Sequence, residues 1–429
     1  MTLTTEDTRI PTKNHACVML GIDKLGLEGR PMPPPPGEVV VAPKKTGICG
    51  SDVHLFLEGR AGESSFCDPL ILGHEAAGVV AQVGSKVTAL QIGDRVALEP
   101  GFCCRRCEFC KGGEYGQCGD FKFAAADGFD GTLQGFFTIP ADFCYRLPES
   151  MSFEEGALIE PLAVAVMAVS SVAKMKHNAN VAIFGAGPVG LLTMAVAKAL
   201  GARRILAVDV NEQRLDFAKG YCATDVHAAI PKNSGEDNMS YSKRHVSLLE
   251  TWRHVQYTTG FAQALEIMKK FGLGERGEGI DLVVECSGAE VCVQTGIWLA
   301  KRRGMFVQVG AGPANNLIPM SILVNKEITV KGSLRYGPGC YQLAIDLVRQ
   351  GRINLKPLLT HRFPFKDAVK AFKAMQNGKG DDGKVTIKVI SEYPCVLSPL
   401  PLIILILMQL TGLWRECIHE PDCWGCKWI

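Results

Sequence analysis

The stretch VAIFGAGPVGLLTMAVAKAL, residues 181–200, decides the fold of the central part of this chain. Its first four residues are apolar and predict a short buried strand, and the pattern GAGPVG then opens directly into an apolar helix. In this setting the first glycine permits a tight turn, the second lets the backbone approach a pyrophosphate, and the third lets helix and strand pack closely. The helix N-terminus then presents unpaired N–H groups to the phosphates. The candidate cofactor-binding residues here are Gly185, Gly187, Pro188, Val189 and Gly190.

A carboxylate at the end of the next predicted strand, residues 205–208, completes this site. Asp209 lies about 20 residues beyond the glycine motif, where it can accept hydrogen bonds from the adenosine ribose hydroxyls. Its charge would repel the 2′-phosphate of NADP, so the sequence favours NAD, although Arg214 nearby could soften that preference. A structural glycine turn with a capping aspartate is the alternative interpretation.

The elements around this motif indicate an α/β protein. After about residue 158, predicted strands and helices alternate, which is typical of a doubly wound parallel sheet. The strands are expected at residues 181–184, 205–208, 282–284, 305–309 and 328–330, and the helices at 163–171, 189–200, 212–219, 341–350 and 367–376, before a closing strand at 384–390. The earlier part is rich in glycine, proline and short β-branched runs, including 38–41, 76–83 and 95–98, and predicts a mainly β domain.

Four cysteines form a compact candidate metal site. Cys104, Cys107, Cys110 and Cys118 have the spacing C-x2-C-x2-C-x7-C, and a closed tetrahedron of thiolates is typical of structural zinc. Cys103 adjoins the set but breaks its spacing, so we leave it out. An iron–sulfur cluster and free thiols are the alternatives.

A second, dispersed set has different ligand chemistry. Cys49, His74 and Glu75 lie in glycine-flanked loops of the β domain, and Glu160 follows at the domain boundary. Individually these residues could be a buried thiol, a core histidine and surface carboxylates. Together they offer sulfur, nitrogen and oxygen donors, which suit a catalytic zinc with a position open for substrate.

Bulk composition limits the partners. The chain has 429 residues, enough for two domains, and its formal net charge of +2 indicates no nucleic-acid partner. No secretory signal is visible, so the 17 cysteines are interpreted as thiols or metal ligands in a reducing, cytoplasmic compartment. The apolar run 400–410 is shorter than the about 20 residues of a membrane span, so none is expected.

Several motifs together resemble the polyol dehydrogenase branch of the zinc-dependent medium-chain dehydrogenase family. They are GICGSDVH (47–54), GHEAAGVV (73–80), IGDRV (92–96), the four-cysteine loop and EPLAVAV (160–166). The resemblance implies a GroES-like catalytic domain beside a Rossmann domain. The expected parts are residues 1–158 (catalytic), 159–330 (Rossmann, with a suspected insertion at 245–261), 331–390 (return to the catalytic domain) and an atypical tail, 391–429.

The resemblance also implies roles for single residues. Cys49, His74 and Glu75 match ligands of the catalytic zinc, and the match to Glu160 is bonded to the metal directly or through water. The other matches are proton-relay positions at Ser51 and His54, and polyol-binding positions at Arg335 and Tyr336. The implied protein is a homotetramer with NAD and two zinc sites, and its implied partners are a small polyol and the corresponding ketose.

The expected reaction is oxidation of xylitol to D-xylulose, with L-arabinitol and sorbitol as alternative substrates. A catalytically silent NAD-binding protein is the alternative from another class. Leu55 stands where the family commonly has a tyrosine near the polyol, and this difference affects the order of preference among polyol substrates. The segment 245–261 and the tail have no family counterpart, and our hypothesis is that both are translated intron sequence, which transcript sequencing across the junctions would test.

Overall fold

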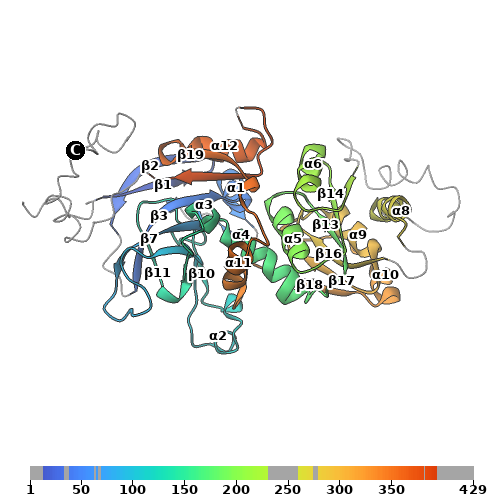
Figure 1. Ribbon diagram of the computed structural model, residues 1–429. Coiled ribbons are helices and arrows are strands. Elements are labelled where there is room, and N and C mark those ends of the chain that lie inside the picture. Colours follow the sequence, from blue (N-terminus) through green and yellow to red (C-terminus); the bar gives the residue numbers. More distant parts are fainter. Residues whose placement is uncertain are drawn as a thin grey trace, which may run out of the picture.

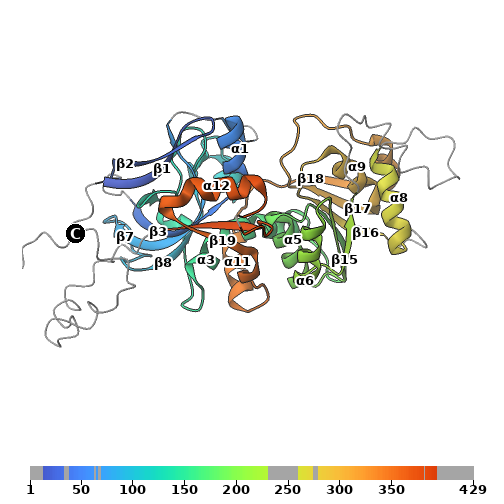
Figure 2. The same cartoon turned by 90° about the horizontal axis from the view of Figure 1, so that it is seen from above.

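The chain forms two domains that lie side by side, as the computed structural model in Figure 1 shows. The structure describes residues 13–32, 38–61, 64–65, 69–229, 259–273, 279–380 and 382–393. One domain is built mainly of antiparallel strands and the other on a parallel sheet. The two domains also lie next to each other in the view from above (Figure 2). A shared hydrophobic core joins them, because Ala97 of the first domain and Ile183 of the second belong to the same buried cluster.

The elements of the first domain come from both ends of the described chain. Its N-terminal elements are β1 (Lys13–Gly21), β2 (Lys24–Pro31), β3 (Val39–Ile48), α1 (Gly50–Glu58), β4 (Arg60–Ala61), β5 (Ser64–Ser65), β6 (Leu70–Ile71), β7 (Glu75–Val83), β8 (Arg95–Leu98), β9 (Gly101–Phe102), α2 (Glu108–Lys111), η1 (Tyr115–Gln117), β10 (Lys122–Phe123), β11 (Phe137–Ile139), η2 (Ala141–Phe143), β12 (Cys144–Arg146) and α3 (Phe153–Ala157). Its C-terminal elements are α11 (Cys340–Arg349), η5 (Lys356–Leu358), β19 (Leu359–Pro364), η6 (Phe365–Asp367), α12 (Ala368–Asn377) and β20 (Lys388–Glu392).

The main sheet of this domain has the strand order β12-β8-β7-β3-β20-β19, with β11 paired to β3. Strand β3 is therefore central, with β7 on one side and β20, from the far end of the described chain, on the other. This pairing brings together residues that are hundreds of positions apart in sequence, and it builds the metal site described below.

The second domain alternates strands and helices. Its elements are α4 (Ile159–Val166), the π-helical η3 (Met167–Val172), β13 (Asn180–Phe184), α5 (Pro188–Ala199), β14 (Arg204–Asp209), α6 (Glu212–Tyr221), β15 (Asp225–Ala228), α8 (Thr259–Phe271), β16 (Ile280–Glu285), α9 (Glu290–Leu299), β17 (Ala300–Gln308), α10 (Met320–Lys326) and β18 (Thr329–Gly332). The parallel sheet has the order β15-β14-β13-β16-β17-β18, so successive strands are added toward one edge up to β15 and toward the other edge from β16, with the switch point between β13 and β16.

Burial on both faces explains why the strands of this sheet are continuously apolar. In β13, Val181 and Ile183 pack into the cluster that contains α4 and α5, whereas Ala182 and Phe184 pack into the cluster that contains α8 and α9. Successive side chains of a strand point to opposite faces, so a strand covered on both faces must be apolar throughout. The predicted α/β class, with a mainly β domain beside a doubly wound parallel sheet, is confirmed.

The element boundaries agree in most places and differ in a few. The closing strand, expected at 384–390, is observed as Lys388–Glu392, and the amphipathic helix α8 begins at Thr259, inside the suspected insertion. The rest of that insertion, 245–258, and the tail from 394 onward lie outside the described residues, as does the apolar run 400–410. Among the residues that the structure describes, no helix has the length and apolar character to cross a bilayer.

Candidate zinc and NAD sites

The mixed donor set assembles where α1 and β7 begin. Cys49 is the N-cap residue of α1, and Gly47 of β3 pairs with Glu75 of β7. The donor atoms of Cys49, His74 and Glu75 all lie within 4.8 Å of one another. A Cβ at Gly47 would lie 2.1 Å from Glu75 Oε2, so only glycine leaves room for this carboxylate.

A buried aspartate orients the histidine of this set. Asp52 Oδ1 lies 3.2 Å from His74 Nδ1, and the same carboxylate accepts hydrogen bonds from the backbone N–H groups of Cys49 and Gly73. Burial alone would raise the pKa of Asp52, but His74 and these N–H groups hold it below its usual value. The second ring nitrogen of His74 is thus left for a metal, the usual carboxylate–histidine–metal arrangement. Our sequence analysis missed this role, although the spacing from Cys49 to the third residue of a helix could have suggested it.

A buried lysine is the second residue that sequence reasoning missed. Lys388 of β20 is 2% exposed, and its ammonium group lies 2.5 Å from both carboxylate oxygens of Glu75. It also donates a hydrogen bond to the Ile48 carbonyl oxygen at 3.1 Å. Lys388 therefore neutralises a carboxylate that would otherwise be a buried, unpaired charge.

The chemistry of the donors fits zinc. Catalytic zinc is typically bound by three protein ligands and keeps a fourth position open for substrate. A thiolate, an imidazole and a carboxylate can supply these three ligands. Glu75 Oε2 is buried and accepts no hydrogen bond from the residues that the structure describes, although Lys388 lies beside it. Glu75 therefore stays a predicted ligand, with this oxygen as its candidate donor atom.

Glu160 lies beside this set rather than within it. The close donor group of the described residues comprises Cys49, His74 and Glu75. Glu160, in the first turn of α4, is buried, and burial together with the charge of Glu75 raises its pKa to about 7, against the opposing effect of His74. A carboxyl group in this position can hold or release a proton near neutral pH.

The expected polyol-binding residues face the same region. Tyr336 is 2% exposed, and its hydroxyl has no hydrogen-bond partner among the described residues, although Glu160 is close enough to influence its pKa. The Arg335 guanidinium lies 3.8 Å from the ring centroid of Phe123, whose ring lies 5.2 Å from that of His74. Arg335 has φ of 52°, an uncommon left-handed conformation for a non-glycine residue. Phe123 therefore separates the metal donors from a strained cationic residue.

The expected proton-relay residues lie on the exposed face of α1. Ser51 and His54 are both exposed, and His54 Nδ1 lies 3.1 Å from Glu58 Oε1. Leu55 points the other way, because it is buried in the cluster that also contains Phe56. A proton that reaches His54 would therefore be at the solvent boundary.

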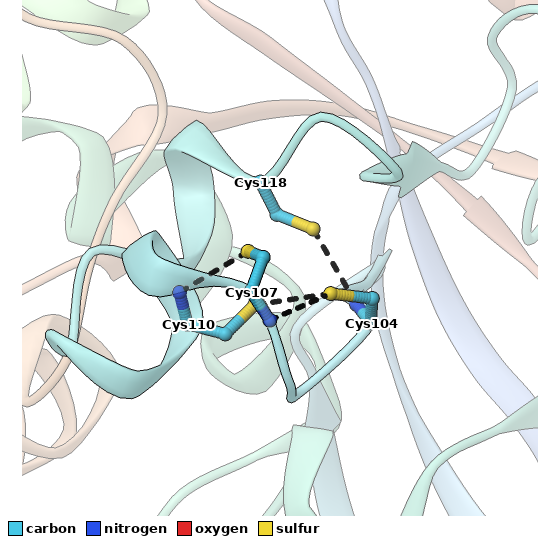
Figure 3. A group of neighbouring side chains, drawn as sticks. All are labelled: Cys104, Cys107, Cys110 and Cys118. Carbon is cyan, nitrogen blue, oxygen red and sulfur yellow. Dashed lines mark hydrogen bonds between the residues drawn. The ribbon is translucent and has the colours of Figure 1, made fainter.

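The four-cysteine loop closes on itself as its spacing predicted (Figure 3). The four sulfur atoms lie within 4.8 Å of one another, and the group does not include Cys103. Backbone N–H groups of Cys104, Cys107 and Cys110 point at sulfur atoms of the set, at 3.3 to 3.5 Å. Such N–H···S contacts favour thiolates, and the cluster is consistent with a structural zinc.

The cofactor motif has the geometry that its sequence predicted. Gly185 has φ of +90°, and a Cβ at Gly190 would lie 1.8 Å from the Gly185 carbonyl oxygen, whereas Gly187 faces open space. Pro188 and Val189 begin α5. Asp209, at the end of β14, accepts hydrogen bonds from Ala186 N at 2.6 Å and Asn211 N at 2.8 Å. The carboxylate is thus fixed against the glycine turn, while Arg214 lies on α6, its backbone N–H bonded to the Asn211 side chain.

Comparison with known proteins gives a consistent result. The alcohol dehydrogenase GroES-like domain matches residues 35–149, and the zinc-binding dehydrogenase domain matches residues 188–350. The chain is 45% identical over 370 residues to a protein named probable D-xylulose reductase A of Neosartorya fischeri, covering 86% of this chain and 95% of that protein. It is 43% identical over 380 residues to D-xylulose reductase A of Aspergillus niger, covering 88% of this chain and 97% of that protein.

A solved structure agrees with these relatives. The crystal structure of an Escherichia coli oxidoreductase/dehydrogenase of unknown specificity superimposes with a TM-score of 0.73 at 31% identity, covering 89% of this chain and 99% of that one. The family predicted from the short motifs is therefore confirmed by matches that extend over both domains. This chain belongs to the medium-chain zinc alcohol dehydrogenase family and is a zinc-binding dehydrogenase.

Proposed function

We propose that this dehydrogenase oxidises a polyol to a ketose with NAD as hydride acceptor, and that xylitol, converted to D-xylulose, is its preferred substrate. The observation that carries the proposal is the donor set Cys49, His74 and Glu75, beside which the buried Tyr336 hydroxyl has no partner among the described residues. The similarity to proteins named D-xylulose reductase supports the choice of substrate.

The metal would be held by Cys49, His74 and Glu75, and Asp52 would fix the orientation of the imidazole. Zinc in such a site supplies Lewis acidity that lowers the pKa of a substrate hydroxyl. Because one ligand is a carboxylate where a second thiolate could stand, the site is harder and better matched to a substrate with several hydroxyl oxygens.

The remaining residues would bind the polyol and manage its proton. Arg335 and Tyr336 would hydrogen-bond to hydroxyl groups remote from the reacting carbon. Glu160, with a pKa raised to about 7, would accept the hydroxyl proton or hold a water molecule beside the metal donors. Ser51 and His54 would pass that proton to solvent along the exposed face of α1.

The cofactor site supports NAD over NADP. The Asp209 carboxylate is held by two backbone N–H groups at the rim of the glycine turn. In this position it can accept hydrogen bonds from ribose hydroxyls and would repel a 2′-phosphate. The pyrophosphate would lie against the N-terminus of α5, where Gly187 leaves open space.

The test is NADH formation with xylitol, L-arabinitol and sorbitol in parallel, first with NAD and then with NADP. The variant His74→Ala should lose turnover and one of two zinc ions per chain while still binding NAD. The matched control Cys107→Ser should lose the other zinc ion and keep measurable turnover. Full activity of His74→Ala would refute the zinc assignment, and a preference for L-arabinitol or sorbitol would keep the mechanism but change the substrate.

Assembly and location are also proposals. We propose a homotetramer, because the edge strand β18 is exposed along its whole length, and exposed apolar side chains occur on it and in the segment that precedes it. These exposed residues are Leu317, Ile318, Met320, Val324 and Val330. A second copy of this chain could cover them, which sedimentation analysis would test. We also propose a cytoplasmic location, in agreement with the free thiols of the described cysteines.

A further inference from the structure

A buried carboxylate connects the four-cysteine lobe to the rest of the catalytic domain. Glu99, directly after β8, is 1% exposed, and its two oxygens accept hydrogen bonds from two different tyrosines. Tyr115, in the lobe and three residues before Cys118, donates to Oε1 at 2.6 Å. Tyr145 of β12 donates to Oε2 at 2.8 Å. Among the described residues Glu99 has no cationic partner in an ion pair, so these two phenols are its side-chain partners.

An aromatic series continues from Glu99 toward the polyol site. The Tyr145 ring stacks on Tyr341 at a centroid distance of 4.9 Å and an interplanar angle of 24°. Tyr341 is fully buried, donates a hydrogen bond to the Leu98 carbonyl oxygen at 2.8 Å, and meets the Tyr336 ring edge-on at 5.0 Å. Tyr336 is the residue whose hydroxyl has no hydrogen-bond partner among the described residues and whose pKa is raised by burial and by the nearby Glu160 carboxylate.

The lobe also lies directly against the segment that carries Tyr336. A Cβ at Gly116 would come within 3.3 Å of the Tyr336 carbonyl oxygen, and one at Gly113 would come within 3.9 Å of the Pro338 ring. A cavity of about 210 Å³ has Glu99, Tyr115 and Tyr145 among its lining residues. The lobe thus contacts Tyr336 at its carbonyl oxygen and Tyr341 contacts it at its ring, and Glu99 holds one tyrosine on each of these two paths.

From this geometry we infer that Glu99 is a positioning residue, which couples the four-cysteine lobe to polyol binding by holding Tyr336 in place through Tyr145 and Tyr341. The inference rests on the proposed role of Tyr336 in binding polyol. It assigns the lobe a function beyond stability, since loss of its metal would displace Tyr115 and weaken the same support.

The test compares Glu99→Leu with Glu99→Gln and with the matched control Glu38→Gln. Glu38 also attaches the lobe, through hydrogen bonds with Arg105 that do not involve the tyrosines. In Glu99→Leu the KM for xylitol should rise about tenfold, the equivalent of one lost hydrogen bond, while the KM for NAD stays unchanged. Glu99→Gln can still accept one phenol hydrogen bond and should restore most of the affinity. Glu38→Gln should behave as the unmodified chain.

A second measurement does not depend on turnover. Hydrogen–deuterium exchange of the peptide covering residues 333–340 should be faster in Glu99→Leu and unchanged in Glu38→Gln, with zinc content measured on the same samples. An unchanged xylitol KM or an unchanged exchange rate in zinc-loaded Glu99→Leu would overturn the inference. If the unmodified chain oxidises no polyol, the proposed function fails, and the exchange measurement still decides whether Glu99 positions this segment.

Discussion

Replacing Lys388 by methionine tests the electrostatic design of the metal site. The substitution keeps most of the side-chain length but removes the ammonium group that lies 2.5 Å from both oxygens of Glu75. Because Glu75 is 0% exposed, its charge would lose its cationic partner in a site shielded from solvent. Removing one partner of a buried ion pair costs about 3–5 kcal/mol, so we expect the metal-free variant to lose this much free energy of unfolding.

Zinc should reduce this loss, because a metal held by Glu75 supplies positive charge in place of Lys388. The assay is urea unfolding followed by circular dichroism, with and without zinc, on Lys388→Met, Glu75→Gln and the double variant. In the Glu75→Gln background Lys388 is itself the buried charge without its carboxylate partner, so its loss should cost at most about 1 kcal/mol, the value of its hydrogen bond to Ile48. An equal loss in both backgrounds would refute the reasoning and show that Lys388 acts through packing alone.

Three further predictions concern the cofactor turn, the cofactor preference and the pH dependence of stability. In Gly190→Ala the new Cβ would lie 1.8 Å from the Gly185 carbonyl oxygen, so the free energy of unfolding should fall by about 1–3 kcal/mol. In Gly187→Ala the new Cβ faces open space, so the melting temperature should stay unchanged while the KM for NAD rises. Equal melting temperatures for the two variants would contradict this. Asp209→Asn should lower the ratio of kcat/KM for NAD to that for NADP by about tenfold, and an unchanged ratio would show that Asp209 is only a cap for the turn. Burial raises the pKa of Glu99 from 4.5 to about 7, so its contribution to stability is present at acidic pH and is lost as the pH rises through 7. The free energy of unfolding should therefore fall between pH 4.5 and 7 by up to about 3 kcal/mol relative to Glu99→Gln, and a constant difference across this range would exclude the effect.

Local signals were sufficient to predict the geometry of the candidate cofactor turn and of the four-cysteine lobe. In both, the functional residues follow one another within a single turn or loop, so their spacing already implies their geometry. The glycine turn between β13 and α5, the carboxylate at the end of β14 and the closed sulfur cluster are found where the sequence predicted them. The alternation of strands and helices was likewise enough to predict the parallel sheet. Helices pack on both faces of β13, as the alternation implies.

The sequence by itself thus determined the family, the fold class and the donor types, because each is written in short-range patterns of glycine, cysteine and hydrophobic residues. Only the tertiary structure decided which residues contact the candidate metal donors and neutralise their charge. Lys388 reaches Glu75 across 313 positions because β20 and β7 both pair with β3, and no local pattern encodes that strand order. In the same way, Glu99 meets Tyr115 and Tyr145 and, through Tyr145, Tyr341, because the lobe packs against the sheet. Buried charges find their partners through the packing of distant segments, which follows from the three-dimensional topology and not from spacing along the chain.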